Sequence, residues 1–127
     1  MQVQRRPGVP AAERALRRQG RETLARLLGA GMEAFRTRGY HAARVDDIVR
    51  TASTSHGTFY LYFANKDDLL RALAHECTEE MQAISDGLGP VTPDGAGRAE
   101  LRRWVEGFYR TYERYGVVIR VWMVGQG

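Results

Sequence analysis

The stretch "ASTSHGTFYLYFANKDDLL", residues 52–70, decides the fold of this 127-residue chain. Four aromatic rings fall within five residues, between a Ser/Thr cluster and a lysine. On a helical wheel Phe59 and Phe63 coincide, with Tyr62 beside them, and these three rings form the edge that faces a core. Gly57 and Tyr60 point the other way. A bare glycine and a phenol on the outer face suit a helix that lies against another molecule.

Apolar residues at helical spacing predict an all-α fold around this short helix. A glycine at position 39 is expected to end the first helix, and glycine at position 116 to end the fifth. Asn65 can cap the fourth. No convincing strand alternation and no internal repeat occur in the sequence. The predicted elements cover residues 23–38, 45–52, 56–63, 66–86, 98–115 and a sixth apolar element at 117–124.

A longer helix followed by two short helices and a tight turn is the pattern of a helix-turn-helix. We therefore expect a three-helix DNA-binding unit within residues 21–66. Residues 1–20 contain two prolines and two glycines and are predicted to be a flexible basic arm. Residues 67–127 are predicted to hold a long linking helix and part of a helical regulatory and dimerisation domain.

Charge is distributed unevenly along the chain. Residues 1–50 hold eleven Arg against five Asp and Glu, whereas residues 51–127 hold eight Arg and Lys against ten Asp and Glu. A basic first half favours an anionic partner. The alternative is a solvated arginine-rich tail without a partner.

The segment "RGYHAARVDDIVRTASTSHGTFYLYFANKDDLL", residues 38–70, resembles the DNA-binding domain of the TetR/AcrR family of transcriptional repressors. The likeness covers roughly residues 23–70 and continues more weakly through "LRRWVEGFYRTYERYGVVIRVW", residues 101–122. The resemblance implies a two-fold dimer that binds a double-stranded DNA operator. It also implies release by a small-molecule ligand in the C-terminal helical domain.

The resemblance implies base contacts from the start of the third helix and phosphate contacts around it. His56 and Gly57 match the positions that read base edges, and Tyr62 and Lys66 match phosphate contacts. Packing of the tyrosines against neighbouring helices is the alternative. Ser53 replaces the family's usual turn glycine, so a left-handed backbone there would be strained. The residues expected to contact DNA are Arg44, Ser55, His56, Gly57, Thr58, Tyr60, Tyr62 and Lys66.

The C-terminal third leaves two interpretations open. Its aromatic side chains could line a pocket for a small apolar ligand, or they could be ordinary core. The apolar residues 117–124 predict self-association through residues 101–124, or poor solubility. The family normally continues through further helices, so we expect a truncated product or fragment. A truncated interaction module that titrates an intact regulator is the alternative function. The candidate ligand-binding residues are Trp104, Phe108, Tyr112 and Trp122.

The sequence gives no indication of an enzyme, a metal, a cofactor or a membrane span. Its three histidines form no pair at i, i+4, and no phosphate-binding glycine loop or serine elbow is present. No apolar run approaches the roughly 18 residues of a membrane span. The single cysteine, Cys77, fits a reducing compartment, so we expect a cytoplasmic protein.

Overall fold

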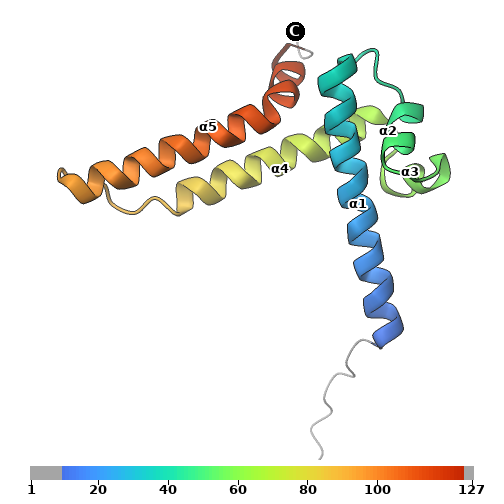
Figure 1. Cartoon of the computed structure of the whole chain (residues 1–127), viewed down its shortest axis with the longest axis horizontal. Helices are drawn as coiled ribbons and strands as arrows, with labels where there is room; N and C mark the ends of the chain where they lie inside the picture. The colour runs from blue at the N-terminus through green and yellow to red at the C-terminus, as the bar shows by residue number, and fades with distance from the viewer. Residues whose placement is uncertain (1–9, 125–127) are drawn as a thin grey trace, which may run out of the picture.

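The computed structural model describes residues 10–124 and shows an all-α fold, as predicted (Figure 1). These residues form five helices and no strand. The helix starts at positions 45, 56 and 66 match the sequence prediction. The helices are α1 (Ala11–Arg38), α2 (Val45–Thr51), α3 (His56–Tyr62), α4 (Lys66–Asp86) and α5 (Gly95–Val124).

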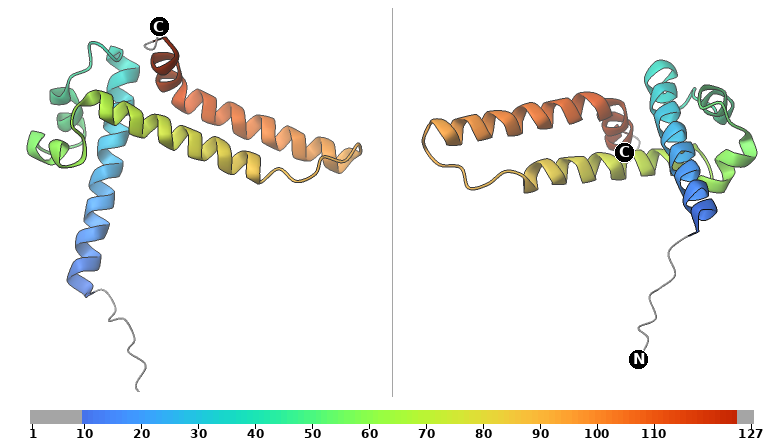
Figure 2. Two further views of the ribbon diagram at one scale, coloured as in Figure 1. Left: turned by 180° about the vertical axis from the view of Figure 1, so that it is seen from behind. Right: turned by 60° about the horizontal axis from the view of Figure 1, so that its bottom comes forward.

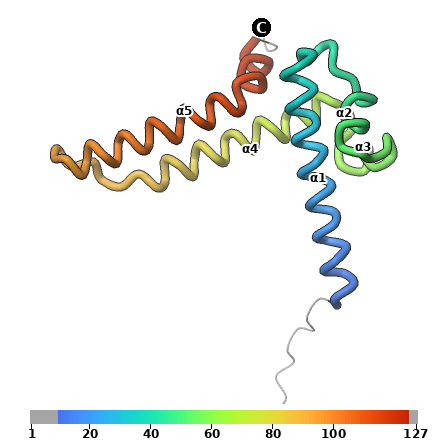
Figure 3. The backbone as a smooth tube through the Cα atoms, viewed as in Figure 1, coloured from blue at the N-terminus to red at the C-terminus, as the bar shows by residue number. Residues whose placement is uncertain are grey.

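The helices form a small cluster joined to a long hairpin. In Figures 1 and 2, α2 and α3 lie against one side of α1, and α4 leaves this cluster as a long arm. The tube in Figure 3 shows α5 returning antiparallel along α4 until its C-terminal end lies near the C-terminal end of α1. The helix-turn-helix and the hairpin are therefore connected through α4.

One apolar core joins the cluster to the start of α4. Phe35 of α1, Ile48 of α2, Phe59 of α3 and Leu69 of α4 are all completely buried. Gly31 allows the close approach of α4 to α1, because a Cβ at that position would lie 2.2 Å from Cδ2 of Leu69.

The start of α4 is capped as the sequence predicts. The Asn65 side chain accepts a hydrogen bond from the Asp68 backbone N–H at 2.8 Å. The Asp68 carboxylate in turn accepts from the backbone N–H of Ala64 at 3.0 Å. These bonds satisfy amide groups that a helix start leaves without partners. They fix the point at which the chain leaves the helix-turn-helix.

The predicted flexible arm at residues 1–20 is wrong for residues 11–20, which belong to α1. The helix begins directly after Pro10, and its first turns are rich in Ala, Arg, Glu and Leu. These residues have high helix propensities, which outweigh a cost of about 1 kcal/mol for Gly20 within the helix. Arg5 and Arg6, the other part of the basic arm, lie outside the described residues.

The predicted end of a helix at Gly116 is also wrong, because α5 is continuous from Gly95 to Val124. Figure 1 instead shows that the last turns of α5, drawn in red, turn away from the axis of the preceding part. A glycine within a helix is a common site of such a bend. Tyr115 and Val118, on either side of Gly116, are both buried, so packing holds the helix together across it.

The apolar surface of α5 is only partly buried. Thr111, Tyr115 and Val118 make the buried side of this helix. The apolar stripe Leu101, Val105, Phe108 and Tyr112 is partly exposed, and its aromatic members line a hollow against α4. Among the described residues, no helix is both long enough and apolar enough to cross a membrane.

Candidate nucleic-acid interface

Helix α3 is held by one face and exposed on the other, as its wheel predicts. Phe59 and Phe63 are buried in the core, and their ring centroids lie 5.5 Å apart. On the opposite side, Tyr60 is 54% exposed and Leu61 is 82% exposed. A seven-residue helix with so much apolar surface in water gains little stability from that surface. The exposed face is therefore a candidate contact surface.

The start of α3 is fixed by its own side chains. Oγ of Ser55 accepts a hydrogen bond from the Thr58 backbone N–H at 3.1 Å and lies 3.0 Å from Oγ1 of Thr58. Because the two hydroxyl groups share one hydrogen bond, one hydroxyl hydrogen is free for an outside acceptor. Both residues were predicted to contact DNA. The structure brings them together beside exposed His56 and Gly57.

The turn between α2 and α3 contains a strained residue. Ser53 has φ of 54°, and it is the only non-glycine residue with positive φ among residues 10–124. A left-handed conformation costs an ordinary residue about 1–2 kcal/mol. The next residue, Thr54, donates its backbone N–H to the Val49 carbonyl at 2.9 Å, which closes the turn. The turn therefore has the geometry expected at the position where the family usually has glycine.

A hydrogen bond that the sequence did not predict joins α2 to the start of α3. Nε2 of His56 lies 2.5 Å from Oδ1 of Asp46. The hydrogen bond to His56 and the imidazole charge lower the pKa of Asp46, and Arg44 and Arg50 lower it further. Asp46 and His56 are ten residues apart in the sequence, and the turn between α2 and α3 brings them together.

Arg44 lies at the N-terminal end of α2, with an exposed side chain. Its backbone N–H donates to Oδ2 of Asp47 at 3.0 Å, which is the contact that the third helical residue makes in a capping box. Asp47 also pairs with Arg38 at 3.5 Å. Asp47 therefore ties the start of α2 to its capping residue and to α1.

Lys66 does not have the free ammonium group that a phosphate contact needs. Its Nζ donates to the carbonyl oxygens of Tyr40 at 2.7 Å, His41 at 3.0 Å and Ala43 at 3.1 Å. It also lies 4.7 Å from the centre of the Tyr40 ring. An ammonium group has three N–H donors, and all three are used here. We therefore correct its predicted role: Lys66 ties the α1–α2 loop to α4.

Tyr62 fits both interpretations of the tyrosines, because it packs against a neighbouring helix and is also partly exposed. Its ring lies near Phe63, and its hydroxyl donates to the Gly20 carbonyl of α1 at 3.3 Å. Packing against a neighbouring helix therefore describes Tyr62, although the side chain remains 37% exposed. Tyr60 makes an edge contact with Phe59 and has no such helix partner for its hydroxyl among the described residues.

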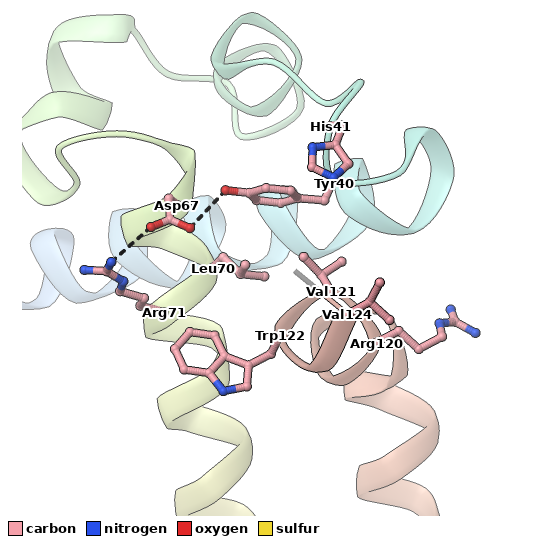
Figure 4. A pocket seen from close by; sticks show the side chains of 9 residues that line it. All are labelled: Tyr40, His41, Asp67, Leu70, Arg71, Arg120, Val121, Trp122 and Val124. Atoms are coloured by element: carbon pink, nitrogen blue, oxygen red, sulfur yellow. Dashed lines mark hydrogen bonds and ion pairs between the residues drawn. The ribbon is translucent and has the colours of Figure 1, made fainter. Parts of the chain in front are cut away.

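Beside Lys66, a second set of contacts joins the α1–α2 loop to α4 (Figure 4). The Tyr40 hydroxyl donates to Oδ1 of Asp67 at 3.1 Å, and Asp67 pairs with Arg71 at 3.3 Å. Burial, followed by the bond and charge of Asp67, raises the pKa of Tyr40 to about 12. These groups line a hollow of about 470 Å³ that the C-terminal end of α5 completes with Val121, Trp122 and other residues.

Three of the four predicted ligand-binding residues come together between α4 and α5. Phe108, Tyr112 and Trp122 line a hollow of about 540 Å³ with Met81 and Met123. All three aromatic side chains are partly exposed, so they are not ordinary core.

Trp104 does not line that hollow. Its ring stacks on Phe108 with centroids 5.5 Å apart. Its buried Nε1 has no hydrogen-bond partner among the described residues. Among these residues no cluster of three or more His, Cys, Asp or Glu could hold a metal ion.

Comparison with known proteins finds a family match for the helix-turn-helix segment. Residues 27–73 match the family described as "Bacterial regulatory proteins, tetR family". The chain is 37% identical over 59 residues to a fatty acid metabolism regulator protein of Bacillus subtilis, covering 46% of this chain and 30% of that protein. It is 39% identical over 96 residues to the transcriptional regulator AcuR of Cereibacter sphaeroides, covering 73% of this chain and 44% of that protein.

A third relative is the transcriptional regulator TtgR of Pseudomonas putida, 31% identical over 88 residues, or 67% of this chain and 42% of that protein. The chain thus spans less than half the length of each of these three relatives. No solved structure matches it. The matched segment contains the whole of α2 and α3 with the strained turn between them. On this combination of sequence match and helix-turn-helix geometry, the chain belongs to the TetR family of bacterial regulatory proteins.

Proposed function

We propose that this chain is a sequence-specific DNA-binding transcriptional regulator, which acts through α3 as its recognition helix. The observation that carries the proposal is the division of this helix into a buried and an exposed face. Phe59 and Phe63 anchor it, while His56, Gly57 and Tyr60 are presented outward. A major groove admits a helix presented in this way.

Backbone contacts are assigned to the groups around α3. Arg44 supplies an exposed cation at the start of α2, and the paired hydroxyl groups of Ser55 and Thr58 supply a donor. Such contacts fix the position of a protein on the duplex, whereas base edges specify the sequence. We assign the base edges to His56 and Tyr60. Tyr62 contributes a partly exposed ring, with its hydroxyl held by α1.

We also propose that the regulator is a repressor that a small apolar ligand controls. The hollow lined by Phe108, Tyr112 and Trp122 supports this proposal, because aromatic walls of this size suit a small molecule. The names of the relatives support regulation and not catalysis. A DNA target supports a cytoplasmic location.

A second candidate function is an interaction module that titrates an intact regulator. One observation favours it: α5 exposes an apolar stripe that includes Leu101 and Val105. A related chain with a matching stripe would pair with it. Tight, selective DNA binding by this chain alone would argue against this alternative.

Selection of duplexes from a randomised pool by the full chain tests the proposed function. We expect enrichment of one sequence, and we expect Tyr60→Ala to lower affinity for it by roughly tenfold, the loss of one base or backbone contact. Tyr109→Ala is the matched control, since Tyr109 is equally exposed but lies on α5. Recovery of random sequences, or equal effects of the two variants, would contradict a recognition role for α3.

A further inference from the structure

The contact between Asp46 and His56 lies where the recognition helix begins. Asp46 is in the first turn of α2, and His56 is the first residue of α3. The two side chains are 59% and 55% exposed, so the pair is at the surface and not part of the core. The contact therefore holds the outward-facing side chain of His56 at the start of α3, which is the end expected to meet base edges.

The chemistry of the contact assigns one ring nitrogen. An ionised carboxylate only accepts hydrogen bonds, so Nε2 of His56 must carry the hydrogen of the 2.5 Å bond to Asp46. The pKa of Asp46 is lowered by this bond, which keeps the carboxylate ionised. Nδ1 is then the only other hydrogen-bonding atom of the ring. In a neutral ring Nδ1 accepts a hydrogen bond, and in a protonated ring it donates one.

These two states of Nδ1 match different groups. An acceptor fits the amino groups that adenine and cytosine present in the major groove, whereas a donor fits N7 of either purine, O6 of guanine and O4 of thymine. Without Asp46, a neutral ring could present either a donor or an acceptor by changing tautomer or by rotating.

We propose that Asp46 is a positioning residue that sets the base preference of His56. It fixes the imidazole ring and holds the ring hydrogen on Nε2, which leaves Nδ1 as an acceptor that selects the amino group of adenine or cytosine. This inference rests on the proposed function and assigns one specificity determinant within it. It gives Asp46 an indirect role, because the carboxylate acts on DNA through the imidazole.

Two arginines are the other charged groups that act on the pair. Arg44 and Arg50 are the further charges that act on Asp46. Helix α3 itself contains no titratable group besides His56 and its two tyrosines.

The test begins with the duplex that the full chain selects, followed by a panel with each base pair replaced in turn. Binding to each duplex is then measured. For the unsubstituted protein, we expect a preference for adenine or cytosine at one base pair. For Asp46→Asn we expect the preference at that pair to weaken by about tenfold.

A double variant separates positioning from a direct contact of Asp46. If Asp46 acts through His56, adding Asp46→Asn to His56→Ala changes the preference no further. The matched control is Glu79→Gln, which breaks a comparable exposed pair with His75, 3.0 Å apart on α4. This control should leave every base preference unchanged.

Nitrogen NMR of the free protein gives a reading independent of DNA. When the His56 ring is neutral, we expect its hydrogen on Nε2 in the unsubstituted protein and a mixture of tautomers in Asp46→Asn. A chain that selects no duplex contradicts the proposed function, and the inference falls with it. Selection with an unchanged preference in Asp46→Asn, or an equal effect of that substitution in the His56→Ala background, overturns the inference alone.

Discussion

At the scale of single residues, the contact geometry separates groups that the sequence places together. Lys66 and Arg44 were both expected to bind phosphate, but three backbone carbonyls occupy the ammonium of Lys66. The first position of a helix lies at the positive end of the helix dipole, where a cation is unfavourable. The sequence therefore indicates that Lys66 needs a partner elsewhere. Its partners lie in a loop 23–26 residues earlier, so their position depends on the fold.

Substitution of the two cations should therefore give opposite results. Lys66→Met should lower the free energy of unfolding by about 2 kcal/mol, since it leaves three carbonyl groups without their charged donor. Arg44→Ala should leave stability nearly unchanged and reduce the salt dependence of DNA binding by about one phosphate contact. Urea unfolding and binding across a salt series measure the two effects. A reduced salt slope with unchanged stability in Lys66→Met would restore the phosphate assignment.

Ser53 gives a second prediction at this scale. Ser53→Gly relieves a left-handed backbone at φ of 54° but also loosens the unfolded chain. We expect a net stabilisation of about 0.5–1 kcal/mol, measured from the urea midpoint. Ser85→Gly, in the last turn of α4, is the control and should destabilise by a similar amount. Destabilisation by both substitutions would show that the turn carries no relievable strain.

At the scale of helices, the sequence predicted best where local signals agree. The starts of α2, α3 and α4 follow from apolar spacing, with a capping residue for α4, and all three are confirmed. The errors arose at glycines. The first helix was predicted to begin after Gly20 and the fifth to end at Gly116, yet α1 and α5 continue through these glycines because neighbouring residues favour helix or are buried. The Asp46–His56 contact and the ties of Lys66 could not be predicted, because they depend on how two helices meet.

The link between the α1–α2 loop and α4 gives a prediction with a pH dependence. Folding raises the pKa of Tyr40 to about 12, from an ordinary value of about 10. The folded chain therefore keeps this proton while the unfolded chain loses it, so stability falls between about pH 10 and pH 12.

Tyr40→Phe removes the titrating group and its bond to Asp67. We expect it to cost about 1 kcal/mol at neutral pH and to make the decline above pH 10 less steep. Thermal unfolding as a function of pH measures both effects. Tyr109→Phe is the control at an exposed tyrosine. A decline that stays equally steep in Tyr40→Phe would assign it to another group, such as Tyr115, whose pKa is also raised to about 12 by burial and Glu76.

At the scale of the whole molecule, α4 connects two regions with different surfaces. The helix-turn-helix has a closed core and exposes the outer face of α3, whereas the hairpin leaves one apolar side of α5 partly exposed. Leu101, Val105, Phe108 and Tyr112 lie at helical spacing on that side. Exposed apolar patches of this kind mark interaction sites or cause aggregation.

We therefore expect the 14.3 kDa chain to self-associate through residues 101–124. Sedimentation across a concentration series should show the mean mass rising from that of the monomer. Val105→Glu should shift this rise to roughly tenfold higher concentration, because association would bury a charge without a partner. Gln82→Glu, an equally charged change at an exposed position of α4, should leave it unchanged. A monomer at every concentration, or equal behaviour of the two variants, would remove the stripe as an association surface and leave its aromatic part to the ligand-binding proposal.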